Sequence, residues 1–163
     1  MEVKIKKLDE NAVVPSYAKH GDAGLDLTAT SKYYDDHGNV CYGTGLAFEI
    51  PYGFVGLLFP RSSNTKKDLI LGNSVGVLDS GYRGEVVFKF KQHPDVGYNE
   101  DDVIVVDHVL DYEIGDKIGQ LIIMPYPKVK FKLVDELSTS DRGTGGFGST
   151  GPITKSIEEN YSA

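Results

Sequence analysis

The chain has 163 residues, the length of one domain, with 40% hydrophobic and 25% charged residues. Acidic residues outnumber basic ones by 24 to 17 and the net charge is −7, which argues against binding along a nucleic-acid backbone. The single cysteine, Cys41, excludes a disulfide within the chain or a cysteine metal site. The longest apolar run is far below the ~20 residues of a membrane span, and the charged start MEVKIKKLDE lacks a signal-peptide core. We therefore expect a cytoplasmic protein that binds neither membranes nor nucleic acid.

Short runs of β-branched and aromatic residues recur between turns rich in Gly, Pro, Asn and Asp. These strand-like runs cover residues 3–8, 25–29, 46–50, 54–59, 75–78, 85–90, 103–109, 117–124 and 128–134. Many short strands separated by such turns predict an all-β sandwich or jelly roll. Only residues 62–71 are typical of a helix, of one or two turns with Ser62 as its cap. We expect at most one short helix.

Three polar positions along the first half of this pattern are candidates for chemistry. Asp26 lies between two leucines, so it either faces solvent or holds a metal-bound water. Arg61 and two serines follow a predicted strand in PRSSN, where the backbone amides of a helix start favour anions. Gln120 places an amide inside an apolar strand and needs a partner when buried.

The stretch GVLDSGYRG, residues 76–84, lies between two predicted strands. Asp79 is either a solvated turn residue or a carboxylate placed to take a proton from water beside a phosphate. Tyr82 is either an ordinary strand-end aromatic or a wall for a sugar.

The three arginines each lie in a Gly- or Ser-rich loop, whereas the other 14 basic residues are lysines. A guanidinium grips phosphate or carboxylate with two hydrogen bonds, a geometry that lysine cannot copy. Because charges ordinarily lie in loops, Arg61, Arg83 and Arg142 by themselves leave an anion site and plain surface charge both open.

The stretch RGTGGFGSTG, residues 142–151, matches the dinucleotide fingerprint G-x-G-x-x-G. That fingerprint needs a following helix and a distant acid, and the fifteen residues after Gly148 leave no room for them. Its chemistry still suits a nucleotide. Arg142 can neutralise phosphate, and Phe147 offers a flat face on which a base can stack, an interaction of about 1–3 kcal/mol.

Taken in order, AGLDL, PRSS, GVLDSGYRG, GQLI and RGTGGFGSTG closely resemble the five motifs of the homotrimeric dUTP pyrophosphatases, the dUTPases. The resemblance covers roughly residues 20 to 151. It implies a distorted jelly-roll, or β-clip, subunit that assembles as a homotrimer with active sites at subunit boundaries. It also implies Mg²⁺-dependent hydrolysis of dUTP to dUMP and pyrophosphate, which keeps uracil out of DNA and supplies dUMP for dTTP synthesis.

The resemblance implies roles for individual residues around the nucleoside. Asp79 matches the carboxylate that orients and deprotonates the water attacking the α-phosphorus. Tyr82 matches the tyrosine that packs against deoxyribose and excludes a 2′-hydroxyl. Asn73, Val77 and Leu78 match positions around a deoxyuridine pocket too narrow for a 5-methyl group.

Further roles are implied along the phosphates. Arg61, Ser62 and Ser63 match the phosphate-binding second motif. Gln120 matches a polar contact to phosphate and water, and Asp26 matches an acid that reaches Mg²⁺ through water. The residues that match the closing arm over the substrate are Arg142, Phe147, Gly148 and Ser149.

The resemblance also implies three segments: a β domain over 1–137, a glycine-rich closing arm over 138–151 and a C-terminal extension over 152–163. The chain departs from the family pattern in three places, the first being this extension, which runs further than in many relatives. Loop 93–110 is longer than usual, and Gly119 stands where alanine is common, which we expect to be a small packing change. Arg83 either braces its motif or makes a subunit contact.

Two other functions remain open. A dCTP deaminase, or a bifunctional deaminase–dUTPase, shares the fold, although Tyr82 and the complete fifth motif favour a plain dUTPase. A dUTPase-fold regulator would keep the nucleotide pocket and act through a protein partner, with loop 93–110 as the first candidate surface.

Overall fold

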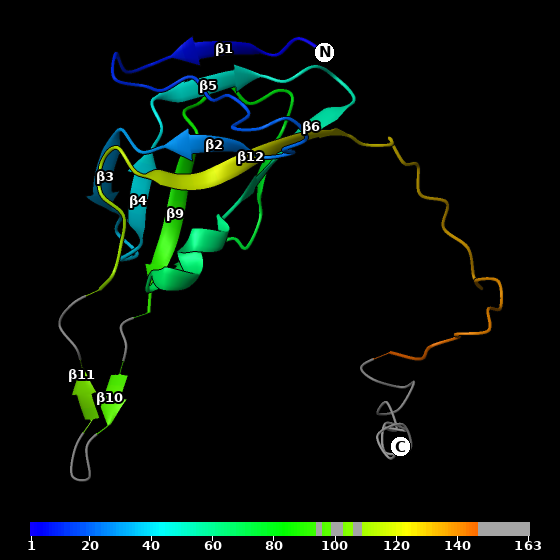
Figure 1. The fold of residues 1–163 in the computed structure, drawn as a ribbon. Coiled ribbons are helices and arrows are strands. Elements are labelled where there is room, and N and C mark those ends of the chain that lie inside the picture. Colours follow the sequence, from blue (N-terminus) through cyan, green and yellow to red (C-terminus); the bar gives the residue numbers. More distant parts are fainter. Residues whose placement is uncertain (94–95, 99–102, 106–108, 147–163) are drawn as a thin grey trace, which may run out of the picture. The chain divides into compact units, whose positions relative to one another are not determined.

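The computed structural model describes residues 1–93, 96–98, 103–105 and 109–146 (Figure 1). Contacts divide the chain into two units, Met1–Lys128 and Val129–Ala163, which are described separately. The elements in chain order are β1 (Lys4–Lys7), β2 (Leu25–Thr28), β3 (Ser31–Tyr34), β4 (Val40–Gly43), β5 (Leu46–Glu49), β6 (Phe54–Phe59), the 3₁₀ helix η1 (Ser62–Lys66), β7 (Leu69–Leu71), β8 (Gly76–Leu78), β9 (Val87–Gln92), β10 (Val96–Tyr98), β11 (Val103–Val105) and β12 (Lys117–Pro125).

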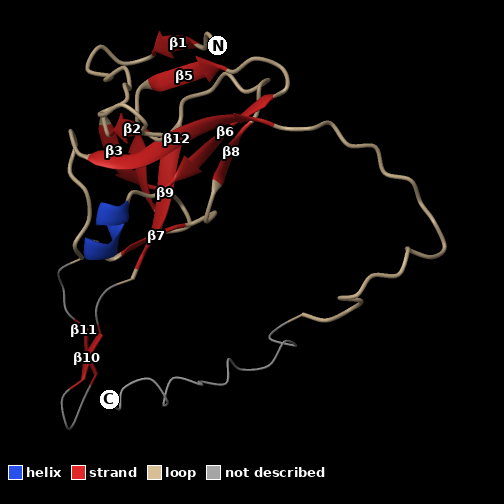
Figure 2. Ribbon diagram, turned by 45° about the vertical axis from the view of Figure 1, so that its right-hand side comes forward, coloured by secondary structure: helices blue, strands red, loops and turns tan. Residues whose placement is uncertain are grey.

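Two four-stranded antiparallel sheets make up most of the first unit (Figure 2). Their strand orders are β2-β12-β6-β8 and β3-β4-β9-β7, while β1 pairs with β5 and β10 with β11. Strands far apart in sequence lie side by side, as β2 does with β12 and β4 with β9. Such connections are typical of a jelly roll. The predicted all-β fold with at most one short helix is confirmed for the described residues.

Buried side chains from both four-stranded sheets form one hydrophobic core. Its largest fully buried members include Tyr42, Phe88, Phe90, Leu27, Leu46 and Ile50. The Tyr42 hydroxyl donates to the backbone oxygen of Tyr112 at 3.0 Å and accepts from its backbone nitrogen at 3.1 Å. A phenol can therefore be buried at the centre of this core without an unsatisfied polar group.

The predicted helix begins where it was expected, but the prediction of Ser62 as its cap was wrong. The 3₁₀ helix covers Ser62–Lys66, but its flanking residue is Arg61, and no side chain caps it. Ser62 already lies inside the helix, so its hydroxyl is not at the capping position. Residues Leu69–Leu71, which the pattern joined to the helix, form β7 and pair with β9. In the described part of the chain, no helix is long and apolar enough to cross a membrane.

The predicted strand over residues 128–134 was wrong. Among the described residues, this segment forms no strand, and its side chains at Phe131 and Leu133 are 96% and 99% exposed. The alternation of lysine with apolar residues is typical of a half-buried strand. A strand nevertheless needs a hydrogen-bonded neighbour, and sequence pattern alone does not supply one.

The effect of glycine at position 119 on packing is larger than the sequence analysis predicted. A Cβ atom added at Gly119 would overlap the ring of Phe88, which is almost fully buried. The backbone of Gly119 is not left-handed, so lack of space and not conformation requires glycine here. Alanine would force the Phe88 ring to move, and overpacking of this kind costs about 1–3 kcal/mol.

Candidate active site

Three of the candidate residues meet because their strands are neighbours in one sheet. In the register of β12, Gln120 lies opposite Asp26 of β2 on one side and Phe59 of β6 on the other. Strand β6 then leads directly through Pro60 into Arg61 and the 3₁₀ helix. Segments about 95 residues apart in sequence (26 to 120) are thus brought to one place on the sheet.

Arg61 is held in this position by a paired interaction with a carboxylate. Its Nε donates to Asp26 Oδ1 at 2.8 Å and its Nη2 to Asp26 Oδ2 at 3.4 Å. Its Nη1 donates to Ser63 Oγ at 3.3 Å, while the Gln120 side-chain amide donates to the backbone oxygen of Pro60 at 3.1 Å. Ser62 lies between Arg61 and Ser63 as the first residue of the 3₁₀ helix.

Lys117 joins this group, although the sequence interpretation missed it. Its Nζ lies 3.0 Å from Asp26 Oδ2. The register of β12 against β2 shifts between Lys117 and Gly119, which indicates a β-bulge. Ile118 and Gly119 are therefore both buried, whereas Lys117 stays exposed on the outer face beside Asp26. No motif marks such a bulge in advance. We call Asp26, Arg61, Ser63, Lys117 and Gln120 the Arg61 cluster.

The charges of the Arg61 cluster favour an anion. Partial burial would raise the pKa of Asp26, but hydrogen bonds from Lys117 and Arg61 outweigh it and hold that pKa below the usual 3.8. Asp26 is therefore ionised at neutral pH and balances one of its two cations. The surplus positive charge and the hydroxyl and amide groups beside it suit phosphate oxygens.

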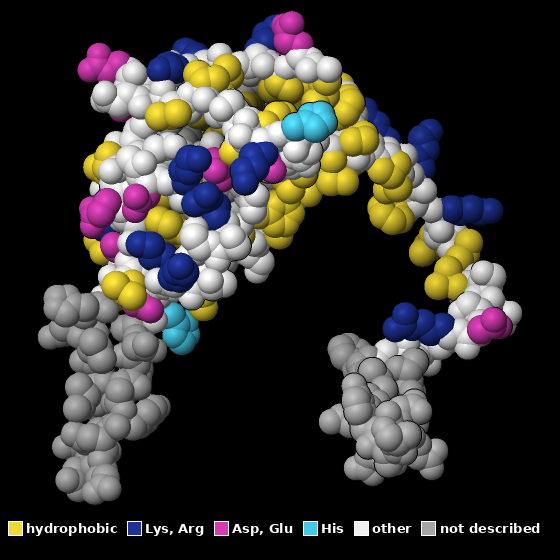
Figure 3. Space-filling view, in the orientation of Figure 1, with side chains coloured by type: hydrophobic (Ala, Val, Ile, Leu, Met, Phe, Trp, Pro, Cys, Tyr) yellow, Lys and Arg dark blue, Asp and Glu magenta, His cyan; other side chains and the backbone are white. Residues whose placement is uncertain are grey.

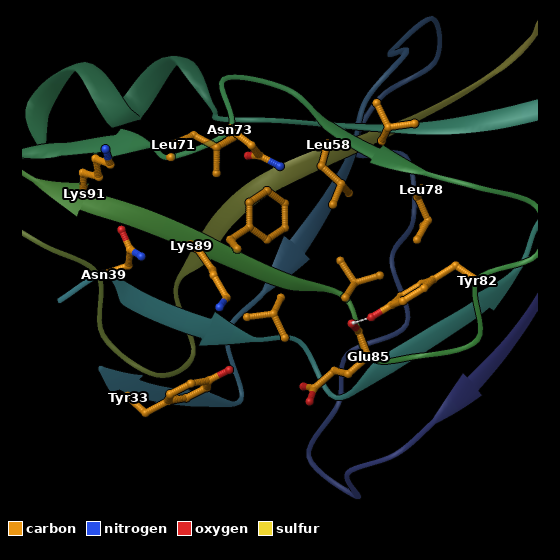
Figure 4. Close-up of a pocket in the computed structure, with 16 residues that line it drawn as sticks. Tyr33, Asn39, Leu58, Leu71, Asn73, Leu78, Tyr82, Glu85, Lys89 and Lys91 are labelled. Atoms are coloured by element: carbon orange, nitrogen blue, oxygen red, sulfur yellow. Dashed lines mark hydrogen bonds between the residues drawn. The ribbon is translucent and has the colours of Figure 1, made fainter. Parts of the chain in front are cut away.

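A second group of candidates lines a cavity of about 520 Å³ beside the β7–β8 turn (Figure 4). Asn73, Val77, Leu78 and Tyr82 all contribute to its wall, together with residues of β9. Leu78 is buried, whereas the Val77 side chain is 65% exposed. The mixed apolar and amide lining suits a flat polar ring such as a nucleobase.

The β7–β8 turn that carries Asn73 is strained. The next residue, Ser74, has a φ of 61°, a left-handed conformation that is uncommon for residues other than glycine. Hydrogen bonds from Ser74 N to Leu71 O and from Val75 N to Asn73 O hold the turn in this shape. Strained backbone of this kind clusters at functional sites.

Asp79 directly follows β8 and is exposed at the start of a tight turn. The backbone nitrogen of Tyr82 donates to the backbone oxygen of Asp79 at 3.0 Å. One guanidinium nitrogen of Arg83 donates to the backbone oxygens of Ser80 and Tyr82 at 2.7 and 2.8 Å. Arg83 thus braces the turn that presents Asp79 and Tyr82.

One chain does not bring Asp79 and the Arg61 cluster together. Strand β8 runs antiparallel to β6, and Leu78, just before Asp79, pairs with Gly56. Arg61 lies five residues after Gly56 in the direction of β6. At ~3.3 Å per residue, this places Arg61 roughly 16 Å along the sheet from Leu78. The carboxylate and the cation cluster therefore lie toward opposite ends of the β6–β8 pair.

The second unit is described as far as residue 146. There, Arg142 closes a turn on itself, with Nε donating to Gly145 O at 2.9 Å and Gly145 N donating to Arg142 O at 3.0 Å. Gly143 has a φ of 52°, which this turn requires. The predicted arm residues Phe147, Gly148 and Ser149 lie outside the described residues.

The residues present do not form a dedicated metal cage. In the described ranges, no group of three or more His, Cys, Asp or Glu side chains could hold a metal ion. Both Asp26 oxygens already accept bonds from Arg61 and Lys117. A Mg²⁺ ion, which retains waters and favours phosphate oxygens, therefore fits here only with a bound ligand as its main source of oxygens and Asp26 reached through water.

Comparison with known proteins identifies the family of the chain. The family model described as dUTPase matches residues 10–151. Among curated relatives, the deoxyuridine 5′-triphosphate nucleotidohydrolase of Clostridium acetobutylicum is 41% identical over 156 residues, which cover 93% of this chain and 97% of the relative. That of a Picosynechococcus species is 35% identical, with 93% and 99% covered.

Solved structures are similar as well. The dUTPase of Staphylococcus bacteriophage 80alpha with dUPNHPP superposes with a TM-score of 0.73 at 29% identity and covers 93% of this chain and 99% of its own. A dUTPase from phage phi11 of S. aureus, described for its species-specific insert, gives a TM-score of 0.66 at 27% identity, with 86% and 100% covered. The chain therefore belongs to the dUTPase family and is a dUTP diphosphatase.

Proposed function

We propose that the chain hydrolyses dUTP with Asp79 as the general base. Asp79 takes a proton from a water whose oxygen forms a bond to the α-phosphorus; the bond from that phosphorus to the bridging oxygen breaks, and pyrophosphate leaves with the electron pair. The observation that carries this proposal is the turn that joins Asp79 to Tyr82 at the wall of the 520 Å³ cavity. Asn73 and the backbone of Val77 and Leu78 would hold deoxyuridine in that cavity.

The phosphates would lie against the cations. Phosphoryl-group hydrolysis asks the protein mainly for positioning and charge neutralisation. Arg61, Ser62 and Ser63 supply these groups at the start of the 3₁₀ helix, and Gln120 adds an amide in the same sheet. Arg142 would approach from the arm over 138–151, with Phe147 over the base and Gly148 and Ser149 on the terminal phosphate. The β domain would then end at residue 137, and 152–163 would be an extension.

Mg²⁺ is part of the proposal. A dUTPase from phage phi11 is described with a structural Mg(II) ion. In this chain the ion would be held by substrate oxygens, with Asp26 as a partner through water, and it would neutralise charge on the phosphates. Asp26 would at the same time hold Arg61 in position through their paired hydrogen bonds.

We also propose that the active enzyme is a homotrimer whose sites are shared between chains. A water at the α-phosphorus and the oxygens of the same triphosphate lie within a few Å of each other, whereas Asp79 and Arg61 lie toward opposite ends of β6 and β8. A neighbouring chain can supply the missing half of each site. A closed ring of three identical chains repeats this contact three times.

Hydrophobic side chains lie exposed on part of the surface of the first unit (Figure 3), and those on the outer face of the β2-β12-β6-β8 sheet support the assembly. Leu57 of β6 pairs with Val77 of β8 and Ile122 of β12, which gives an apolar row across three strands on the side away from the core. The run FVGLLF is apolar on both faces, a pattern typical of strands buried on both sides. We propose that further copies of this chain cover this face.

The segment 128–134 supports the same conclusion. It alternates lysine with apolar residues, and Phe131 and Leu133 are almost fully exposed. A neighbouring copy would supply the strand that this segment lacks. Both apolar surfaces would then be buried by one assembly.

The substrate assignment is tested by pyrophosphate release from dUTP, dCTP, dTTP and UTP, each with Mg²⁺ and with excess EDTA. We expect rapid turnover of dUTP only, and loss of turnover in EDTA. Ammonia is followed in parallel, because its release from dCTP would indicate a deaminase or bifunctional enzyme instead. Equal turnover of dUTP and dTTP would contradict the proposed base pocket.

A second role through a protein partner is favoured by one comparison and one structural feature. Phage dUTPases similar to this chain are described as controlling the transfer of virulence genes. Loop 93–110 of this chain contains the two-stranded β10–β11 sheet in addition to the two main sheets. We propose this loop as the surface for a protein partner, in an enzyme located in the cytoplasm.

The partner role is tested by replacing residues 94–108 with a short Gly-Ser linker. We expect turnover of dUTP to stay within about threefold of the wild type, because the loop contributes none of the proposed site residues. Pull-downs from the source cells with the wild type and the loop-deleted enzyme should then differ in one partner protein. If both enzymes recovered the same proteins, loop 93–110 would not be the partner-binding surface.

A further inference from the structure

The position of the Tyr82 ring is set by Gly84 and Glu85, two and three residues further along the chain. The Tyr82 hydroxyl donates to the backbone oxygen of Glu85 at 3.0 Å (Figure 4). The ring lies over Gly84, where an added Cβ atom would come within 2.6 Å of Tyr82 Cζ. Gly84 does not have a left-handed backbone, so it is the ring that requires glycine at this position.

Glu85, whose backbone oxygen accepts the Tyr82 hydrogen bond, is itself held in place by its side chain. The Glu85 carboxylate accepts from the backbone nitrogen of Gly45 at 2.8 Å. It lies against Gly43, where an added Cβ would be 2.5 Å from Glu85 Oε1. Glu85 therefore fastens the start of β9 to the β4–β5 turn.

The next residue strengthens this attachment. Val86 N donates to Leu46 O at 2.9 Å, and Val86 O accepts from both the backbone nitrogen and the hydroxyl of Thr44, at 3.1 and 2.8 Å. Thr44 is fully buried. The peptide that receives the Tyr82 hydrogen bond thus has little freedom to move.

We propose that Glu85 is a positioning residue for sugar discrimination and acts through Tyr82. This inference rests on the proposed function, in which Tyr82 packs against deoxyribose. A pocket rejects a ligand that is larger by one hydroxyl only if the side chain facing that hydroxyl cannot move away. The Glu85 carboxylate holds its peptide, the peptide oxygen holds the Tyr82 hydroxyl, and Gly84 leaves room for the ring.

The test measures kcat/KM for dUTP and for UTP in Glu85→Ala, Glu85→Gln and wild-type enzyme. We expect the dUTP-to-UTP ratio to fall about tenfold or more in Glu85→Ala, mainly through better use of UTP. Glu85→Gln should restore the ratio to within about threefold, because its amide oxygen can still accept from Gly45. An unchanged ratio in folded Glu85→Ala would overturn the proposal.

Two controls separate positioning from general loss of stability. Val40→Ala removes buried volume from β4 in the core and should lower Tm without changing the ratio. Tyr82→Phe removes the hydroxyl and should lower the ratio by about as much as Glu85→Ala does. The double variant should then lose no more than either single variant, since both break one interaction. Additive losses would mean that Glu85 does not act through Tyr82.

The same assay distinguishes failure of this inference from failure of the proposed function. Wild-type enzyme that releases no pyrophosphate from dUTP would refute the function itself. The other outcome is that the wild-type enzyme turns over dUTP and rejects UTP, and that Glu85→Ala has the same dUTP-to-UTP ratio as the wild type. That result would refute only the role of Glu85.

Discussion

Asp79→Asn is expected to lower kcat for dUTP by about 10²–10⁴-fold, the range in which a positioned general base contributes. The amide has nearly the shape of the carboxylate but cannot take a proton from water. Binding should persist, because the cavity walls at Asn73 and Tyr82 and the Arg61 cluster are unchanged. The measurements are kcat from pyrophosphate release and the Kd of a non-hydrolysable dUTP analogue, which we expect to change by less than about threefold.

The matched control is Asp36→Asn, the same chemical change at an exposed turn outside the cavity lining. It should leave kcat within about twofold of the wild type, since it removes a surface charge and no functional group. Wild-type kcat in Asp79→Asn would rule out Asp79 as the base. Loss of analogue binding would instead assign it to substrate binding.

Mixing two inactive variants is expected to restore activity. In the proposed homotrimer, Arg61→Gln removes a cation that would bind phosphate and Asp79→Asn removes the proposed base, so each variant by itself should be inactive. In a mixed trimer, the intact Asp79 of one chain meets the intact Arg61 of its neighbour at one of the three boundaries. Random assembly of equal amounts should give about a quarter of wild-type activity, because three quarters of the trimers are mixed and each has one intact site.

The mixture is made by co-expression or by joint refolding, and its mass is checked by light scattering. Each variant treated alone in the same way is the control and should stay inactive. If every chain formed its own complete site, no mixture would recover activity. That result would overturn the shared site, although a trimer could still form.

The all-β fold was predictable for local reasons, and the same local patterns supplied the candidate site residues, which stay a prediction. Alternating apolar residues and Gly, Asn and Asp turns specify strands and their ends through short-range sterics. β3, β4 and β10 were missed, because each lies beside a polar, turn-rich stretch that hides a short strand. The strand over 128–134 was predicted wrongly, because alternation describes a side-chain pattern and not the presence of a hydrogen-bonding partner.

Other features of the site depended on contacts between distant residues. Lys117 carries no motif of its own, and the bulge before Gly119 is what brings it to Asp26. Nothing in the local sequence relates Glu85 to Gly45, forty residues away, or Gly119 to the ring of Phe88. Such pairings follow from sheet register, which is decided by the packing of the whole core.

The sequence by itself determined which groups are available: the Asp79 carboxylate in a tight turn, arginines in Gly- and Ser-rich loops, and strands short enough for a jelly roll. Only the tertiary structure decided where they lie. It brought Asp26, Arg61 and Gln120 together, and it placed Asp79 toward the other end of the β6–β8 pair. The physical reason is that residue chemistry is local, whereas antiparallel register is set by long-range hydrogen bonds and burial.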